Sequence, residues 1–175
     1  GVSMAILDDD GTEVSSGEEG EICSRGPGVM LGYLDSPEEN RLAFEHGYFH
    51  SGDLGRMDAD GYIRVTGRKK DLIIRGGTNI APAEVEDLIM EHPSVASVSV
   101  VGMPDRVLGE RMCAFVVPVD GAELELDDIT NFLRSKKIAI QKLPERLELR
   151  TELPTNATGK VEKFKLREEI NRMLQ

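Results

Sequence analysis

The spacing of apolar residues changes partway along the chain, at a short run of charged residues. Before residues 67–71, short strand-like segments are separated by glycine-rich turns, and after this run helical and strand-like segments alternate. A change of this kind at a polar junction is typical of a boundary between two structural parts. The sequence therefore predicts an α+β protein, in which a β-rich part is followed by a small α+β domain.

The first part is expected to consist mainly of strands. They are predicted at residues 2–8 and 20–24 and in a hairpin over residues 54–65 that turns at residues 58–61. One helix interrupts them, because Ser36 takes the position of an N-cap and Pro37 the first helical position. Glu39 then supplies the third position of a capping box ahead of residues 41–44.

The second part is expected to alternate between helices and strands. Pro82 suits the first turn of a helix that should run through Glu91. The apolar residues of this helix, Val85, Leu88 and Ile89, share one face. The remaining elements are predicted as strands at residues 95–101, 111–118 and near 146–150, and as helices at residues 127–137 and from Lys163 onward.

Charge and hydropathy exclude some classes of function. The net charge of −11 disfavours binding to nucleic acid, which depends on clustered lysine and arginine. No run of about 18 apolar residues occurs, and the first residues do not have the composition of a signal peptide. The chain starts without an initiator methionine, so we interpret it as part of a longer protein. We expect that protein to be cytoplasmic, without a transmembrane segment.

The two cysteines do not form a metal or disulfide pattern. Cys23 and Cys113 are far apart in the sequence, and each lies in an apolar strand-like run. We therefore expect two reduced cysteines in the core and no metal site.

Three segments carry residues that could take part in chemistry. In residues 48–54, Asp53 follows Gly52 between strands and could accept hydrogen bonds from vicinal hydroxyls, although an Asp after a Gly usually only makes a turn. In residues 67–86, a basic cluster precedes a buried strand, paired glycines and a helix that begins with proline. Taken alone, that second segment would be a solvated basic turn and a tight loop.

The third segment, residues 153–160, is a loop that presents Lys160 ahead of the last helix. It is not a Walker A loop, because the first glycine of that motif is absent and Val161 replaces the final Ser or Thr. A lysine on such a loop is usually a solvated charge, but its compact ammonium could also be brought to a phosphate.

In their order and spacing, these segments resemble the adenylate-forming superfamily, which includes acyl-CoA synthetases, aryl-CoA ligases, luciferases and peptide-synthetase adenylation domains. The resemblance begins at residues 20–33 and ends at Lys160 and the helix that follows it. It implies that residues 1–67 are the β-rich end of a large N-terminal domain, and that residues 68–175 are a small mobile C-terminal domain. It also implies a reaction in which a carboxylic acid and ATP give an acyl-adenylate, whose acyl group then passes to coenzyme A.

The resemblance assigns a role to each candidate site residue. Asp53 matches the residue that binds the ribose hydroxyls, and Arg68 matches an arginine that also contacts the ribose. Lys70 falls on the hinge about which the small domain rotates. Lys160 matches the lysine that bridges the carboxylate oxygen and the α-phosphate, and that is acylated to switch off several relatives.

The paired glycines Gly76 and Gly77 match the loop that lines the pantetheine tunnel. Asn79 stands where some acetate-activating relatives carry an arginine, which argues against an acetyl-CoA synthetase.

The family's phosphate loop and its Tyr-Gly-x-Thr-Glu segment, which serve ATP, Mg²⁺ and the acyl substrate, have no counterpart here. We therefore predict that this chain alone does not adenylate.

Three alternatives to an acyl-CoA synthetase stay open. The acyl group could pass to the phosphopantetheine of a carrier protein, although no carrier domain follows residues 163–175. A luciferase-like oxidase has no supporting feature. The chain could also be a non-catalytic binding module, and a native protein of about 500 residues would favour the enzyme instead.

Strand edges in the first part could be covered in a homodimer.

Overall fold

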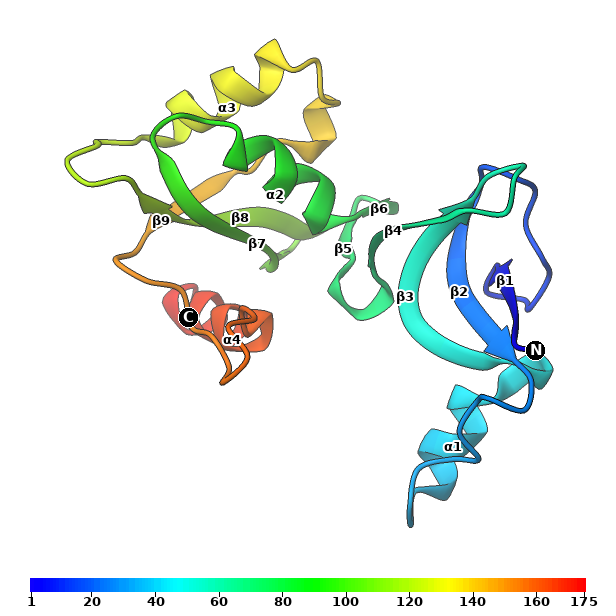
Figure 1. Ribbon diagram of the computed structural model, residues 1–175. Coiled ribbons are helices and arrows are strands. Elements are labelled where there is room, and N and C mark those ends of the chain that lie inside the picture. The colour runs from blue at the N-terminus through cyan, green and yellow to red at the C-terminus, as the bar shows by residue number, and fades with distance from the viewer. The chain divides into compact units, whose positions relative to one another are not determined.

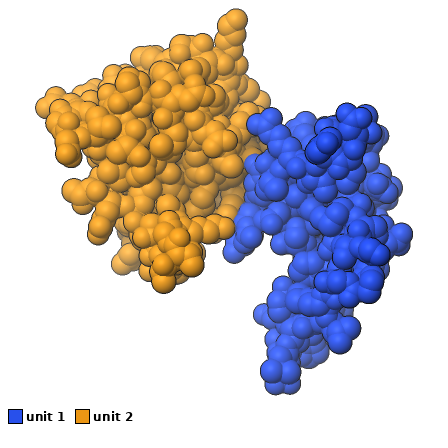
Figure 2. Space-filling view, viewed as in Figure 1, with its two compact units in different colours: residues 1–70 blue, residues 71–175 orange.

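The computed structural model describes all 175 residues, which form two compact units, Gly1–Lys70 and Asp71–Gln175 (Figures 1 and 2). The first unit is mainly β-structure, and the second combines a sheet with three helices. The predicted α+β class is therefore confirmed. The division into functional domains at residue 67, with a hinge near Lys70, stays a prediction.

The first unit is built on one antiparallel sheet in the order β1-β2-β3-β4. Its strands are β1 (Ser3–Leu7), β2 (Glu19–Arg25), β3 (Phe49–Met57) and β4 (Ile63–Arg68). Ala5, Leu7 and Cys23 form its buried core, with Tyr48 packed against them. The β3–β4 hairpin turns as predicted, because the Asp58 side chain accepts hydrogen bonds from the backbone of Asp60 and Tyr62.

Helix α1 (Pro37–Ala43) begins at the predicted proline, but the predicted capping by side chains is wrong. Ser36 makes no capping hydrogen bond, and its hydroxyl donates to the Leu34 carbonyl instead. The Asn40 amide holds the preceding loop by bonding both backbone groups of Tyr33.

The second unit contains a five-stranded sheet centred on β8 (Gly109–Pro118). The long strand β7 (Val95–Asp105) is antiparallel to β8, and β9 (Arg146–Leu149) is parallel to it. A short hairpin of β5 (Ile73–Arg75) and β6 (Thr78–Ile80) joins β8 at Gly109. The predicted elements are present here, but β6 was not expected.

Helices cover both faces of this sheet, with α2 (Pro82–Met90) and α3 (Leu126–Ser135) on one face and α4 (Lys163–Met173) on the other (Figure 1). Side chains alternate between the faces of β8, so Met112 and Ala114 join the core of α2 and α3 while Phe115 joins the core of α4. The longest helix, α4, has 11 residues, and none of the helices could span a membrane.

Candidate functional site

Asp53 and Arg68 lie directly opposite each other on β3 and β4. The guanidinium Nε of Arg68 is 2.7 Å from Asp53 Oδ1, and both side chains are partly exposed. Asp53 Oδ2 and the two terminal nitrogens of Arg68 make no hydrogen bond within the chain. The pair thus offers a carboxylate acceptor and guanidinium donors, side by side, to a ligand with hydroxyl groups.

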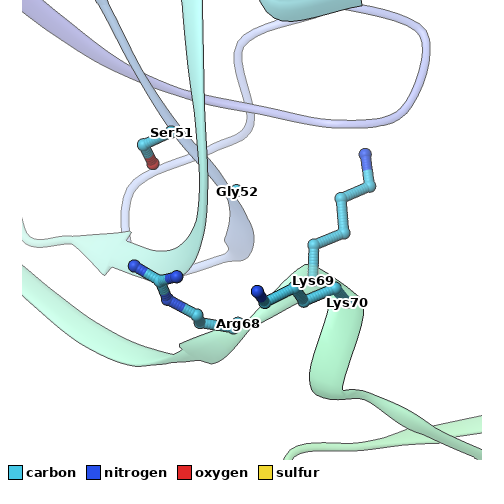
Figure 3. Close-up of a pocket in the computed structure, with 5 residues that line it drawn as sticks. All are labelled: Ser51, Gly52, Arg68, Lys69 and Lys70. Carbon is cyan, nitrogen blue, oxygen red and sulfur yellow. The ribbon is translucent and has the colours of Figure 1, made fainter. Parts of the chain in front are cut away.

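Beside this pair is an open hollow of about 420 Å³, lined by Ser51, Gly52, Arg68, Lys69 and Lys70 (Figure 3). The lining comes from β3 on one side and from the end of β4 and the turn after it on the other. Three consecutive basic residues therefore border one hollow, and such a hollow suits an anionic or polyhydroxyl ligand.

A buried carboxylate, that of Glu21 on β2, supports the β3 wall of the hollow. It accepts hydrogen bonds from the Gly52 backbone N–H at 2.9 Å and from His50 Nδ1 at 3.0 Å. Gly52 has a φ of +74°, and the pairing of β2 with β3 shifts register beside Glu21. Glu21 therefore fixes a backbone bend one residue before Asp53, and glycine supplies the conformation that the bend needs.

Lys69 joins this buried network from the other wall. Its ammonium is 3.2 Å from Glu21 and 2.8 Å from Asp9, and hydrogen bonding to Asp9 is the main reason that its pKa is raised. Burial raises the pKa of Glu21, but the hydrogen bonds from His50, Gly52 and Lys69 outweigh it and hold the pKa below its ordinary value. Both groups therefore stay charged near neutral pH.

Glu21, Cys23 and His50 place potential metal ligands within 4.8 Å of one another. Burial and the nearby Glu21 charge raise the pKa of Cys23 to about 12, so its thiol stays protonated. The Lys69 ammonium already supplies a positive charge to Glu21. In this structure the three groups form a hydrogen-bonded network, in which His50 Nδ1 lies 3.0 Å from Glu21 and 3.4 Å from Cys23 Sγ.

The other predicted residues of the junction lie on turns. Lys70 is exposed in the turn Lys69–Asp71, at the last position of the first unit. Gly76 and Gly77 have φ angles of +56° and +81° and form the two-residue turn between β5 and β6. Such a turn requires positive φ at both positions, so these glycines have a structural reason to be present.

Lys160 lies in the second unit on a loop ahead of α4, in agreement with the sequence prediction. Its side chain is exposed and makes no ion pair or hydrogen bond. In the first unit, Arg68 and Lys70 line one hollow, and Asp53 pairs with Arg68 beside it. In the second unit, the turn of Gly76 and Gly77 and the loop of Lys160 are separate segments.

Sequence reasoning missed the supporting roles of Glu21 and Lys69. Glu21 entered only through the resemblance of residues 20–22, and Lys69 only as one charge in a basic run. Neither the spacing nor the composition of the sequence indicates that the Glu21 side chain is buried, although the residue is only 6% exposed in the structure.

Comparison with known families gives two matches. Residues 84–160 match the AMP-binding enzyme C-terminal domain, and residues 1–34 match the AMP-binding enzyme family. Together the two matches include the loop that ends at Lys160 and the strands β1 and β2.

Relatives include a medium-chain fatty-acid–CoA ligase of Escherichia coli (strain K12), which is 46% identical over 99% of this chain and 31% of its own length. A 2,3-dihydroxybenzoate-AMP ligase of Bacillus subtilis (strain 168) is 41% identical over 98% of this chain and 32% of its own length. The crystal structure of ATP-bound MatB from Rhodopseudomonas palustris matches with a TM-score of 0.93 and 36% identity, over 100% of this chain and 35% of that one. The chain thus spans about a third of the length of these relatives.

Proposed function

The chain belongs to the adenylate-forming family of AMP-binding enzymes, and from this premise we propose that it is part of a ligase that uses ATP to activate a carboxylic acid. The observation that carries the proposal is the Asp53–Arg68 pair beside the hollow that Lys69 and Lys70 border. The relatives named above are themselves called ligases, which supports the same reaction class.

In this proposal the Asp53–Arg68 pair holds the ribose of ATP. The free Oδ2 of Asp53 accepts hydrogen bonds from the ribose hydroxyls, and the terminal nitrogens of Arg68 donate to its oxygens. The buried Glu21 supports this role, because it fixes the Gly52 backbone next to Asp53. A carboxylate held in this way does not need to be ordered again when ATP binds.

Lys160 acts in the adenylation step. A carboxylate oxygen attacks the α-phosphorus of ATP, the bond from that phosphorus to the pyrophosphate oxygen breaks, and pyrophosphate leaves. The ammonium of Lys160 offsets the negative charge that gathers between the two anionic reactants. Since Lys160 makes no ion pair within the chain, its charge is available for this contact.

We further propose that the acyl group passes to the thiol of coenzyme A, which displaces AMP. The turn at Gly76 and Gly77 supports this step, because a Cβ added at Gly77 would meet no atom within 4 Å and the backbone there leaves room for a narrow chain. Rotation about Lys70 would withdraw Lys160 before the thiol enters. Mg²⁺ is expected to accompany ATP at residues outside this chain.

A carrier-protein phosphopantetheine is the second candidate acceptor. The relatives are not all named as CoA ligases, since a pyochelin synthase of Pseudomonas aeruginosa is 44% identical over 98% of this chain. The two acceptors share the adenylation half-reaction and differ only in the thiol that takes the acyl group.

The test is carboxylate-dependent exchange of pyrophosphate into ATP by the full-length protein that contains this chain. A panel of carboxylic acids is assayed with wild type, Lys160→Ala and the control Lys165→Ala, whose lysine lies on α4, pairs with Glu162 and lies over the Phe164 ring. We expect exchange to fall about 100- to 1000-fold in Lys160→Ala and to be unchanged in the control. Equal exchange in wild type and Lys160→Ala would refute the role of Lys160, and no exchange in wild type would refute the function.

The thiol is identified in a second assay with the same protein. Thioester formation with free coenzyme A supports the synthetase, whereas formation only with a phosphopantetheinylated carrier protein supports the alternative.

A further inference from the structure

The loop that carries Lys160 is closed by backbone hydrogen bonds. Thr155 and Val161 pair across it as an isolated antiparallel bridge, and the Asn156 N–H donates to the Lys160 carbonyl at 2.9 Å. The Gly159 N–H donates to the Asn156 carbonyl at 2.9 Å, and Gly159 has a φ of +81°. This is a turn of type I followed by a glycine bulge, a compact connection with little freedom.

The amide of Asn156 is the centre of this turn. Its Oδ1 accepts three hydrogen bonds, from the Thr158 N–H at 3.0 Å, the Thr158 hydroxyl at 2.7 Å and the Lys160 N–H at 3.0 Å. The last of these bonds holds the backbone of Lys160 itself. Asparagine at the first position of such a turn stabilises it through bonds of this kind.

Both ends of the loop are anchored in the core beneath α4. Leu153 is buried in the cluster that contains Phe115 and Leu166, and Val161 packs against the same cluster. Lys160 thus lies next to an anchored residue, while its own side chain is exposed. Between these anchors, Asn156 is the side chain that orders the tip of the loop.

We infer that Asn156 is a positioning residue for adenylation, which acts by holding the backbone of Lys160 so that its ammonium reaches the reacting phosphate in one orientation. The inference rests on the proposed function of Lys160. Without the Asn156 side chain the backbone bonds of the turn remain, but the Thr158 and Lys160 N–H groups lose their acceptor, so Lys160 samples more orientations. Misplacement of a reacting group by about 1 Å can cost about 100-fold in rate.

The first experiment measures adenylation by the full-length protein with Asn156→Ala, Asn156→Ser and the control Asn171→Ala, whose side chain is exposed on α4 and makes no hydrogen bond. We expect Asn156→Ala to lower kcat for exchange about 10- to 100-fold with little change in the KM for ATP. Asn156→Ser should recover part of the rate, because a serine hydroxyl accepts the same bonds more weakly. Thioester formation from preformed acyl-adenylate should be unaffected in all three.

The second experiment tests whether Asn156 acts through Lys160. In a Lys160→Ala background, adding Asn156→Ala should cost almost nothing further, because the group that Asn156 positions is already gone. In the protein with Lys160 intact, hydrogen exchange of peptides that span residues 154–162 should show the Lys160 amide exchanging about tenfold faster in Asn156→Ala than in wild type.

Equal losses from Asn156→Ala with and without Lys160 would overturn the inference and leave the proposed function standing. Full adenylation activity in Asn156→Ala would do the same. If wild type itself catalyses no exchange, the proposed function fails and the inference falls with it. The two failures are therefore distinguishable by the wild-type rate.

Discussion

Replacing Glu21 with alanine tests how strongly the buried network supports the candidate nucleotide site. Glu21 is 6% exposed and accepts hydrogen bonds from Gly52, His50 and Lys69. In the variant Lys69 keeps Asp9 and His50 Nε2 keeps the Glu45 carbonyl, whereas the Gly52 N–H and His50 Nδ1 lose the Glu21 carboxylate. Lys69 is half exposed, so the main loss comes from the Gly52 N–H and His50 Nδ1. Leaving a buried polar group without its partner costs about 1 to 3 kcal/mol, and for these two groups together we expect about 3 kcal/mol.

The assay is urea unfolding of the chain followed by tyrosine fluorescence. The chain has no tryptophan, and its three tyrosines, Tyr33, Tyr48 and Tyr62, all lie in the first unit. The signal therefore reports on the unit that contains Glu21. With a dependence of about 1 kcal/mol per molar urea, a loss of about 3 kcal/mol should lower the midpoint by about 3 M.

Two further variants control this experiment. Glu13→Ala removes an exposed carboxylate that makes no hydrogen bond or ion pair, so the free energy of unfolding should change by less than about 0.5 kcal/mol. Glu21→Gln retains an acceptor for the Gly52 N–H and should lose less than Glu21→Ala. If the free energy of unfolding falls by less than about 1 kcal/mol more in Glu21→Ala than in Glu13→Ala, the network does not support the site and the reasoning is refuted.

The stability that Glu21 contributes through this network should depend on pH. The folded-state pKa of Glu21 lies below its ordinary value of 4.5, so its contribution to stability is fully present above pH 4.5. The contribution is lost as the pH falls through the folded-state pKa. The difference in unfolding free energy between wild type and Glu21→Ala should therefore shrink in that acidic range.

Three other predictions concern the core, the β5–β6 turn and the cysteines. Phe115→Ala, at a fully buried position, should lower the free energy of unfolding of the second unit by about 3 to 5 kcal/mol, measured by circular dichroism in urea. Gly77→Ala should cost about 1 to 2 kcal/mol in the same assay, because φ is +81° there. Cys23 and Cys113, whose pKa values burial raises to about 12, should resist alkylation at neutral pH until urea unfolds the chain.

Much of the fold could be predicted from the sequence because its elements have strong local signals. Helix α2 has a proline at its start and apolar residues on one face, and both features hold whatever the helix packs against. Strand β6 was missed because its three residues, Thr78–Ile80, are too few to show a period. The glycines before it were interpreted as a loop to the helix, although two adjacent glycines also suit a hairpin turn.

The residues of the family motif could be predicted from the sequence, whereas the residues that support them could not. Asp53, Arg68 and Lys160 were found because they match a family motif, and the structure places the first two in contact. Glu21 and Asn156 could not be assigned a role, since hydrogen bonding to a backbone N–H depends on which segments meet in three dimensions. Glu21 accepts a hydrogen bond from the N–H of Gly52, which lies 31 positions later in the sequence.

Glu21 and Asn156 both hold the backbone at or next to a charged site residue, but one is buried and the other is exposed. A carboxylate or an ammonium on a flexible segment loses much of its electrostatic effect, because it must be ordered at the moment of binding. Near Asp53 the order comes from a buried charge, Glu21, and near Lys160 it comes from an exposed amide, Asn156. Loss of Glu21 should therefore lower both stability and nucleotide binding, whereas loss of Asn156 should lower the adenylation rate with little effect on stability. If Asn156→Ala unfolds the second unit, this distinction is wrong.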